Sequence, residues 1–146
     1  MQAVGEGTRW MLRMDPGEEL IGALEEFAAA HGVRAAAVAM GIGTLRSATL
    51  GYWNGKEYEK KEVAEPTELV ALGGSIAEAD GRPSVHLHAA LGTRTHATVS
   101  GHVHRAAVNL LAEVLVETFP AHVFGRPMDE SVGLRILDLE PGHRAT

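Results

Sequence analysis

Hydrophobic residues recur at helical spacing in one stretch near the start of the chain, residues 15–32. Leu20, Leu24 and Phe27 fall on one face of a 3.6-residue period. The flanks carry the residue types that begin and end helices: Asp15 as N-cap, Pro16 in the first turn, Glu18 as capping-box acid and Gly32 as C-terminal stop. The pattern therefore predicts a helix from Asp15 to Gly32.

Elsewhere the hydrophobic positions alternate or form short runs bounded by glycine and proline, which indicates strands. The predicted strands are residues 8–14, 35–43, 47–53, 56–63, 67–79 and 133–142. Short breaker motifs mark where the chain should turn or bulge. They are a tight turn at Gly41 and Gly43, a hairpin at Asn54-Gly55, a bulge at Gly73-Gly74 and a turn at Asp80-Gly81.

Residues 108–119 fit two patterns. A helix would bury Leu111, Val114, Leu115 and Thr118. A strand would place Val108, Leu110, Ala112, Val114 and Val116 on one face. Length favours the helix, whereas the valines and the terminal phenylalanine favour the strand. The pattern alone leaves both open.

The composition excludes several classes of protein. A chain of 146 residues with 45% hydrophobic and 22% charged residues suits one globular domain, residues 1–146. There is no cysteine, so any metal must be held by imidazole, carboxylate or water. The start lacks the features of a signal peptide, and no apolar run approaches the ~20 residues that cross a bilayer. We therefore expect a cytoplasmic protein.

Residues 86–104 hold five of the eight histidines, with one His-x-His pair on each side of a short loop. Because alternate residues of a strand share a face, His86 and His88 should point one way, as should His102 and His104. Metal–nitrogen bonds are ~2.0–2.1 Å long, so two such pairs on adjoining strands could supply three ligands and leave one position open. The alternative is a solvated polar face.

Convergence of the two pairs depends on strand register. Opposed residue numbers must sum to an even value for the even-numbered histidines to share a face. A sum of 188 would place His86 opposite His102 and His88 opposite Ser100, whereas a slip of one residue would abolish the site. The other four histidines show no partner pattern and are expected to be structural, surface or loop residues: His31, His96, His122 and His143.

The two histidine segments, residues 85–92 and 100–117, together resemble the PPC domain, the plants-and-prokaryotes conserved family. The shared pattern is H-x-H, a short hairpin, then G-H with a following E-V. In this chain these are His86, His88, Gly101, His102, Glu113 and Val114. The resemblance continues through residues 14–33, 39–53 and 67–88, and it covers about residues 8–140 in all.

The resemblance implies an α/β (α+β) fold, with a mixed, largely antiparallel sheet packed with one main helix, that assembles as a homotrimer. It favours a strand for the latter part of residues 108–119. It also implies a metal site, with zinc as the usual candidate, at His86, His88 and His102. His104 lies outside the core pattern. A site of neutral imidazoles should bind metal more weakly below about pH 6.

Three functions follow from this picture. The first is a trimeric metal-binding module for zinc or another divalent transition metal, acting on a small-molecule ligand or a protein partner. The second is a DNA-binding regulator, since the plant members of the family carry AT-hooks. The third is a metal-dependent hydrolase or lyase, for which Glu113 is the best-placed general base by motif.

The chain holds no complete AT-hook. The hook needs Arg-Gly-Arg-Pro, but Asp80 and Phe124 stand where the first arginine belongs, before Gly81-Arg82-Pro83 and Gly125-Arg126-Pro127. We expect both sequences to be turns. Four arginines lie in or near predicted turns, where arginine is normally solvated: Arg82, Arg94, Arg105 and Arg126. With a net charge of −6, tight binding to DNA is not expected.

Overall fold

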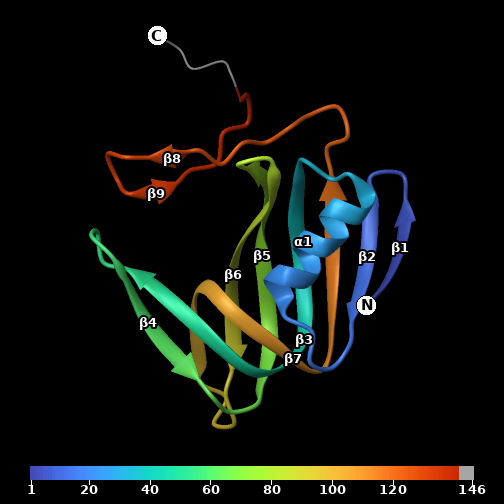
Figure 1. Cartoon of the computed structure of the whole chain (residues 1–146). Coiled ribbons are helices and arrows are strands. Elements are labelled where there is room, and N and C mark those ends of the chain that lie inside the picture. Colours follow the sequence, from blue (N-terminus) through green and yellow to red (C-terminus); the bar gives the residue numbers. More distant parts are fainter. Residues whose placement is uncertain (142–146) are drawn as a thin grey trace.

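One large antiparallel sheet dominates the computed structural model, which describes residues 1–141 (Figure 1). Its seven strands are β1 (Gln2–Glu6), β2 (Arg9–Met14), β3 (Ala36–Trp53), β4 (Tyr58–Val63), β5 (Thr67–Ala79), β6 (Arg82–Gly92) and β7 (Thr98–Thr118). A separate two-stranded sheet pairs β8 (Met128–Asp129) with β9 (Leu134–Arg135). Every named strand pair is antiparallel, and this confirms the predicted fold class.

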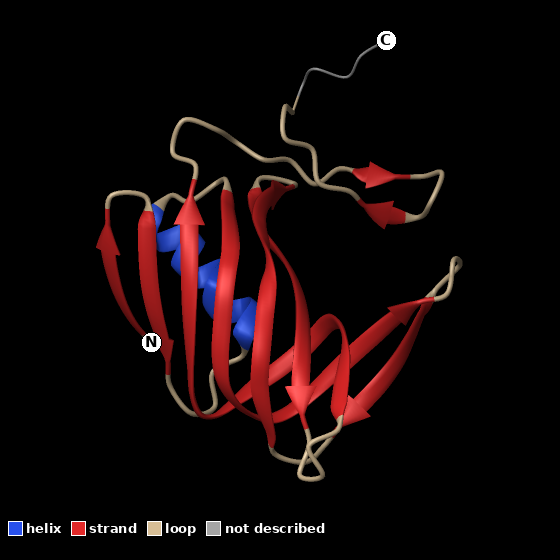
Figure 2. Ribbon diagram, turned by 180° about the vertical axis from the view of Figure 1, so that it is seen from behind, coloured by secondary structure: helices blue, strands red, loops and turns tan. Residues whose placement is uncertain are grey.

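The strand order in the large sheet is β1-β2-β7-β6-β5-β3-β4, and β3 also pairs with β7. The four strands β7, β6, β5 and β3 therefore form a closed ring of pairings, because each one pairs with the next and β3 pairs with β7. Figure 2 shows how strongly the long strands bend to allow this. Because β3 and β7 pair from Ala36↔Thr118 to Gly51↔His102, they connect the edge carrying β1 and β2 with the end carrying β4.

The single helix among the described residues, α1 (Leu20–His31), lies across one face of the sheet (Figures 1 and 2). It starts later than predicted, because Glu19 and not Asp15 is the N-cap: the Glu19 carboxylate accepts a hydrogen bond from the Gly22 amide at 2.8 Å. Asp15 instead pairs with the N-terminal ammonium and with Arg13. The predicted C-terminal stop is confirmed, since Gly32 adopts a left-handed conformation with φ 64°.

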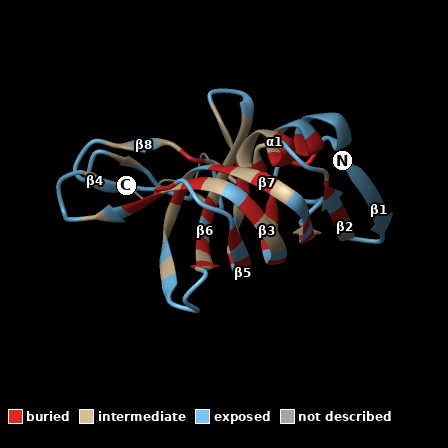
Figure 3. Cartoon of the chain, turned by 90° about the horizontal axis from the view of Figure 1, so that it is seen from below, coloured by how far each residue is buried: buried red, intermediate tan, exposed pale blue. Residues whose placement is uncertain are grey.

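The core lies between α1 and the inner face of the sheet, as the burial colours of Figure 3 show. The predicted helix face is buried, with Leu20, Leu24 and Phe27 at most 1% exposed. No helix among residues 1–141 is long and apolar enough to cross a membrane.

Residues 108–119 belong to β7 up to Thr118, so the strand alternative is confirmed. Val108, Ala112, Val114 and Val116 are buried as that alternative requires. Leu110 departs from it, with 66% of its surface exposed.

The turn predicted at Gly41 and Gly43 and the bulge predicted at Gly73-Gly74 are both wrong. β3 continues without a break through Gly41 and Gly43. Gly43 permits close packing against β7, because a Cβ there would clash with the Leu111 carbonyl oxygen. Gly73 and Gly74 pair in register, and the bulge in β5 falls between Leu69 and Ala71 instead.

The hairpin at Asn54-Gly55 is confirmed, because β3 and β4 pair from Ala48↔Val63 to Trp53↔Tyr58. The predicted last strand, residues 133–142, is wrong over most of its length: β9 has only two residues, and residue 142 lies outside the described chain. The segment after β7 instead crosses the end of β5, where Glu78 exchanges backbone hydrogen bonds with Phe124 and Arg126.

Candidate metal centre

Three histidines from two neighbouring strands converge beside the β6–β7 pairing. His86 and His88 lie on β6 and His102 lies on β7. One nitrogen of each ring can be chosen so that all three atoms lie within 4.8 Å of one another. Strand alternation produces this arrangement, because Leu87, between the two β6 histidines, is fully buried on the opposite face.

The register that brings the pairs together places His88 opposite His102 and Ala90 opposite Ser100. Opposed residue numbers therefore sum to 190. The sum is even, as convergence requires, but it differs by two from 188, so His88 and not His86 faces His102. With Gly92↔Thr98 as the last pair, five residues (93–97) remain in the β6–β7 loop, and His96 in this loop has φ 61°.

A second layer of rings surrounds His102. Tyr58 of β4 stacks on it with ring centroids 4.7 Å apart, and His104 meets it edge-on at 4.8 Å. Gly51 of β3 leaves the space for His104, because a Cβ there would clash with His104 Nε2. His104 thus packs against the cluster without belonging to the convergent set.

Two histidines of the cluster, His86 and His102, have pKa values lowered by their surroundings. Burial, with smaller contributions from His86, His104, His88 and Arg126, lowers the pKa of His102 to about 4. Burial also lowers the pKa of His86, and Arg126 and His88 add to that effect. Neutral imidazole is the form that binds a metal ion, so both rings are ready to ligate at neutral pH.

These residues fit a divalent transition metal. A tetrahedral ion with bonds of ~2.1 Å holds its ligand nitrogens roughly 3.4 Å apart, so small rotations of the three rings would complete the site. His102 Nδ1 is buried and has no hydrogen-bond partner among the described residues, as expected for a nitrogen that could bind an ion. An ion held by three imidazoles keeps at least one position open for water or another ligand.

A cavity of about 470 Å³ opens beside the cluster. His86, His102 and Tyr58 form one side of it, and residues 134–137 form the other. Figure 1 shows the β8–β9 segment standing across from β4, which explains why these distant parts of the chain share a cavity.

Arg126 lines the same cavity and was wrongly expected to be solvated. Its side chain is only 5% exposed, and its Nη2 donates a hydrogen bond to Ser75 Oγ at 2.8 Å. The backbone explains this burial, since the Arg126 amide donates to the Glu78 carbonyl and its carbonyl accepts from Arg135. Burial lowers the pKa of Arg126, but a guanidinium remains charged at neutral pH.

The remaining candidates lie away from the cluster. Glu113 is exposed on β7, where it pairs in register with Arg13 and Ile42, and the convergent set does not include it. His31 packs on Trp10, and its Nδ1 donates a hydrogen bond to the Phe27 carbonyl oxygen at 2.9 Å. His96 and His122 are exposed, and His143 lies outside the described residues.

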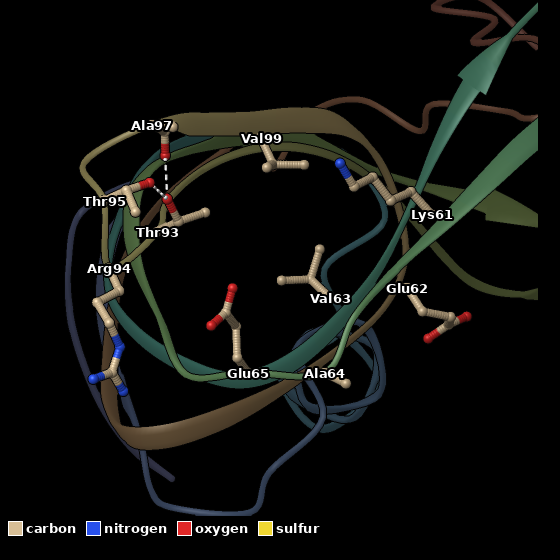
Figure 4. A pocket seen from close by; sticks show the side chains of 10 residues that line it. All are labelled: Lys61, Glu62, Val63, Ala64, Glu65, Thr93, Arg94, Thr95, Ala97 and Val99. Carbon is tan, nitrogen blue, oxygen red and sulfur yellow. Dashed lines mark hydrogen bonds between the residues drawn. The ribbon is translucent and has the colours of Figure 1, made fainter.

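A larger hollow, about 680 Å³, lies at the far end of the sheet between the β4–β5 and β6–β7 connections. Figure 4 shows Glu65 and Val63 turned toward it and Arg94 on its rim. No histidine lines this hollow. The internal bonds of its loop, such as Thr93 Oγ1 to the Ala97 carbonyl at 3.0 Å, stabilise the turn itself.

Sequence reasoning missed Tyr58, Ser75 and Arg126. Tyr58 carries a partial signal, because the predicted hairpin puts it on the strand that follows Asn54-Gly55. Ser75 and Arg126 carry no such signal in the sequence, because their hydrogen bond joins residues that are 51 positions apart.

Comparisons with known proteins agree with this architecture. A metal-containing protein from Archaeoglobus fulgidus is 36% identical, with a TM-score of 0.82 over 89% of this chain and 92% of that one. A proposed DNA-binding protein from Bacteroides thetaiotaomicron is 26% identical, with a TM-score of 0.88 over 94% of this chain and 96% of that one.

Among curated proteins, the bifunctional protein GlmU of Synechococcus sp. (strain JA-3-3Ab) is 32% identical over 92% of this chain and 21% of that protein. The chain thus spans about a fifth of the length of the curated relatives it matches. Residues 1–120 match the family model of the Plants and Prokaryotes Conserved (PCC) domain, which is the PPC family that the histidine motif resembles. The chain therefore belongs to the Plants and Prokaryotes Conserved domain family.

Proposed function

We propose that the protein is a metal-binding module in which His86, His88 and His102 hold one divalent transition metal. The observation that carries this proposal is the convergence of three ring nitrogens within 4.8 Å of one another. Zinc is the preferred ion, because imidazole suits it and the chain offers no thiolate. The similarity to a metal-containing protein from Archaeoglobus fulgidus supports the same assignment.

The module is proposed to act as a homotrimer. Several large apolar side chains are exposed where β3, β5 and β7 meet: Ile42 at 45%, Val70 at 57%, Leu110 at 66% and Leu111 at 38%. Burial of such side chains between subunits is favourable, at roughly 25 cal/mol for each Å² removed from water. The trimer itself is implied by the family.

Two other functions have weaker support. A DNA-binding role rests on the description of the Bacteroides relative, while the net charge of −6 and the burial of Arg126 disfavour it. Metal-dependent hydrolysis would need a general base near the ion, and Glu113 is not part of the cluster. A binding module therefore accounts for more of the structure than either alternative.

Elemental analysis of protein purified without chelators tests the proposal. We expect about one metal ion per chain in the wild type, and loss of that ion in His86→Ala and His88→Ala. His122→Ala is the matched control, because its ring is exposed and outside the cluster. Equal metal content in the wild type and in the cluster variants would contradict the proposal.

A further inference from the structure

Arg126 carries a buried positive charge on the wall of the cavity beside the histidine cluster. Among residues 1–141, no aspartate or glutamate forms a salt bridge with it. One of its donors is bonded to Ser75, but Nε is buried and has no hydrogen-bond partner among those residues. Buried charges in proteins are normally paired, so an unpaired guanidinium facing a cavity indicates an anionic ligand.

The other walls of the cavity are largely apolar. Val85 and Tyr58 contribute on the sheet side, and Leu134, Ile136 and Leu137 contribute on the other. Ile136 and Leu137 are 46% and 37% exposed, so their apolar surface is available to a ligand. The volume of about 470 Å³ lies within the ~300–1,000 Å³ range of small-molecule sites.

We propose that this cavity binds a small organic monocarboxylate. Its carboxylate accepts hydrogen bonds from Arg126, and its hydrocarbon body packs against Ile136 and Leu137. Arginine is suited to this task, because its planar donors match the geometry of a carboxylate. The inference deepens the proposed function and rests on it in part, since His86 and His102, two of the proposed metal ligands, line the same cavity.

Inorganic phosphate shares the oxyanion chemistry but lacks the hydrocarbon body. Affinity for a carboxylate should rise with chain length if the apolar wall is used, roughly three- to fourfold for each buried methylene. Butyrate should therefore bind roughly tenfold more tightly than acetate. Phosphate has no methylene groups, so its affinity gains nothing from the apolar wall.

Isothermal titration of acetate, butyrate and phosphate into the full chain tests the inference, with both metal-loaded and chelator-treated protein. Arg126→Gln should weaken butyrate binding at least about tenfold, since a charge-assisted hydrogen bond is lost. Arg82→Gln is the matched control, because it alters the exposed arginine of the other Gly-Arg-Pro sequence. Leu137→Ser, at a half-exposed wall position, should weaken butyrate binding and leave acetate binding unchanged.

The outcomes separate this inference from the metal proposal. Arg126-dependent butyrate binding by a wild type that contains no metal would uphold the carboxylate site while the metal proposal fails. Equal butyrate affinity in Arg126→Gln and Arg82→Gln would overturn the inference, as would tighter binding of phosphate than of butyrate. If Arg126→Gln does not fold, the acetate–butyrate comparison in Leu137→Ser decides the matter, and unchanged butyrate affinity there overturns the inference.

Discussion

Acidification of the metal-free protein should lower its free energy of unfolding, with His102 as a main contributor. The ring has a pKa of about 4 in the folded protein, against 6.5 for an ordinary histidine, chiefly because burial disfavours its charged form. Between these two values the unfolded chain binds a proton that the folded chain does not. The free energy of unfolding is therefore unaffected by the titration of this residue above about pH 6.5, and it falls as the pH is lowered toward about 4.

The magnitude follows from the same two values. Each pKa unit corresponds to about 1.4 kcal/mol, so the difference between 6.5 and about 4 sets a ceiling of roughly 3 kcal/mol. His102 is only partly buried, and the neighbouring histidines titrate together with it. After allowing for solvent screening, we expect about 1–2 kcal/mol to be lost through this residue by about pH 4.5.

Urea unfolding of chelator-treated protein between about pH 7 and about pH 4.5 measures the loss. His102→Gln should lose about 1–2 kcal/mol less than the wild type over this range. His122→Gln, which alters an exposed ring, should lose as much as the wild type. A ring titration of His102 by NMR with a midpoint near 6.5, together with equal losses in all three proteins, would refute the reasoning.

Three further predictions concern packing, assembly and DNA. Gly74→Ala should destabilise the protein by about 2–4 kcal/mol and reduce its metal content, because its Cβ would clash with the His86 carbonyl oxygen. Gly73→Ala is the control, since its Cβ would meet only the Val38 carbonyl oxygen at 3.8 Å, and equal losses of unfolding free energy in the two variants would contradict the argument. Leu110→Lys should convert the proposed trimer to monomers in light scattering, and a wild type that is already monomeric at micromolar concentration would contradict the proposed trimer. In a gel-shift titration near physiological salt, AT-rich duplex should not bind more tightly than ~10⁻⁴–10⁻⁶ M, and salt-sensitive binding well below this range would favour the regulator.

Features that depend on neighbouring residues could be predicted from the sequence. The β3–β4 turn is one example, because the Asn54 side chain itself accepts hydrogen bonds from the amides of Lys56 and Glu57. Gly32 is another, since a left-handed residue after a helix is a local requirement. The facing of His86 and His88 follows equally from strand alternation.

Features that depend on distant segments could not be predicted in this way. Gly41 and Gly43 resemble a turn in the sequence, but they serve the close approach of β3 to β5 and β7. The choice of Glu19 as N-cap depends partly on a distant segment, because its second carboxylate oxygen accepts a hydrogen bond from the Ala106 amide at 3.0 Å. Burial of Arg126 likewise depends on backbone bonds to residues remote in the sequence.

Glycines next to the histidines show why the site and the fold depend on each other. A Cβ on Gly101, the residue before His102 in the family motif, would lie 2.6 Å from the Gly51 carbonyl oxygen. A Cβ on Gly51 would in turn meet the His104 ring. β3 can approach β7 at this point only because both residues lack side chains. The motif glycine therefore sets the position of the strand that carries His102, and the histidines converge because β3, β6 and β7 pack closely around them.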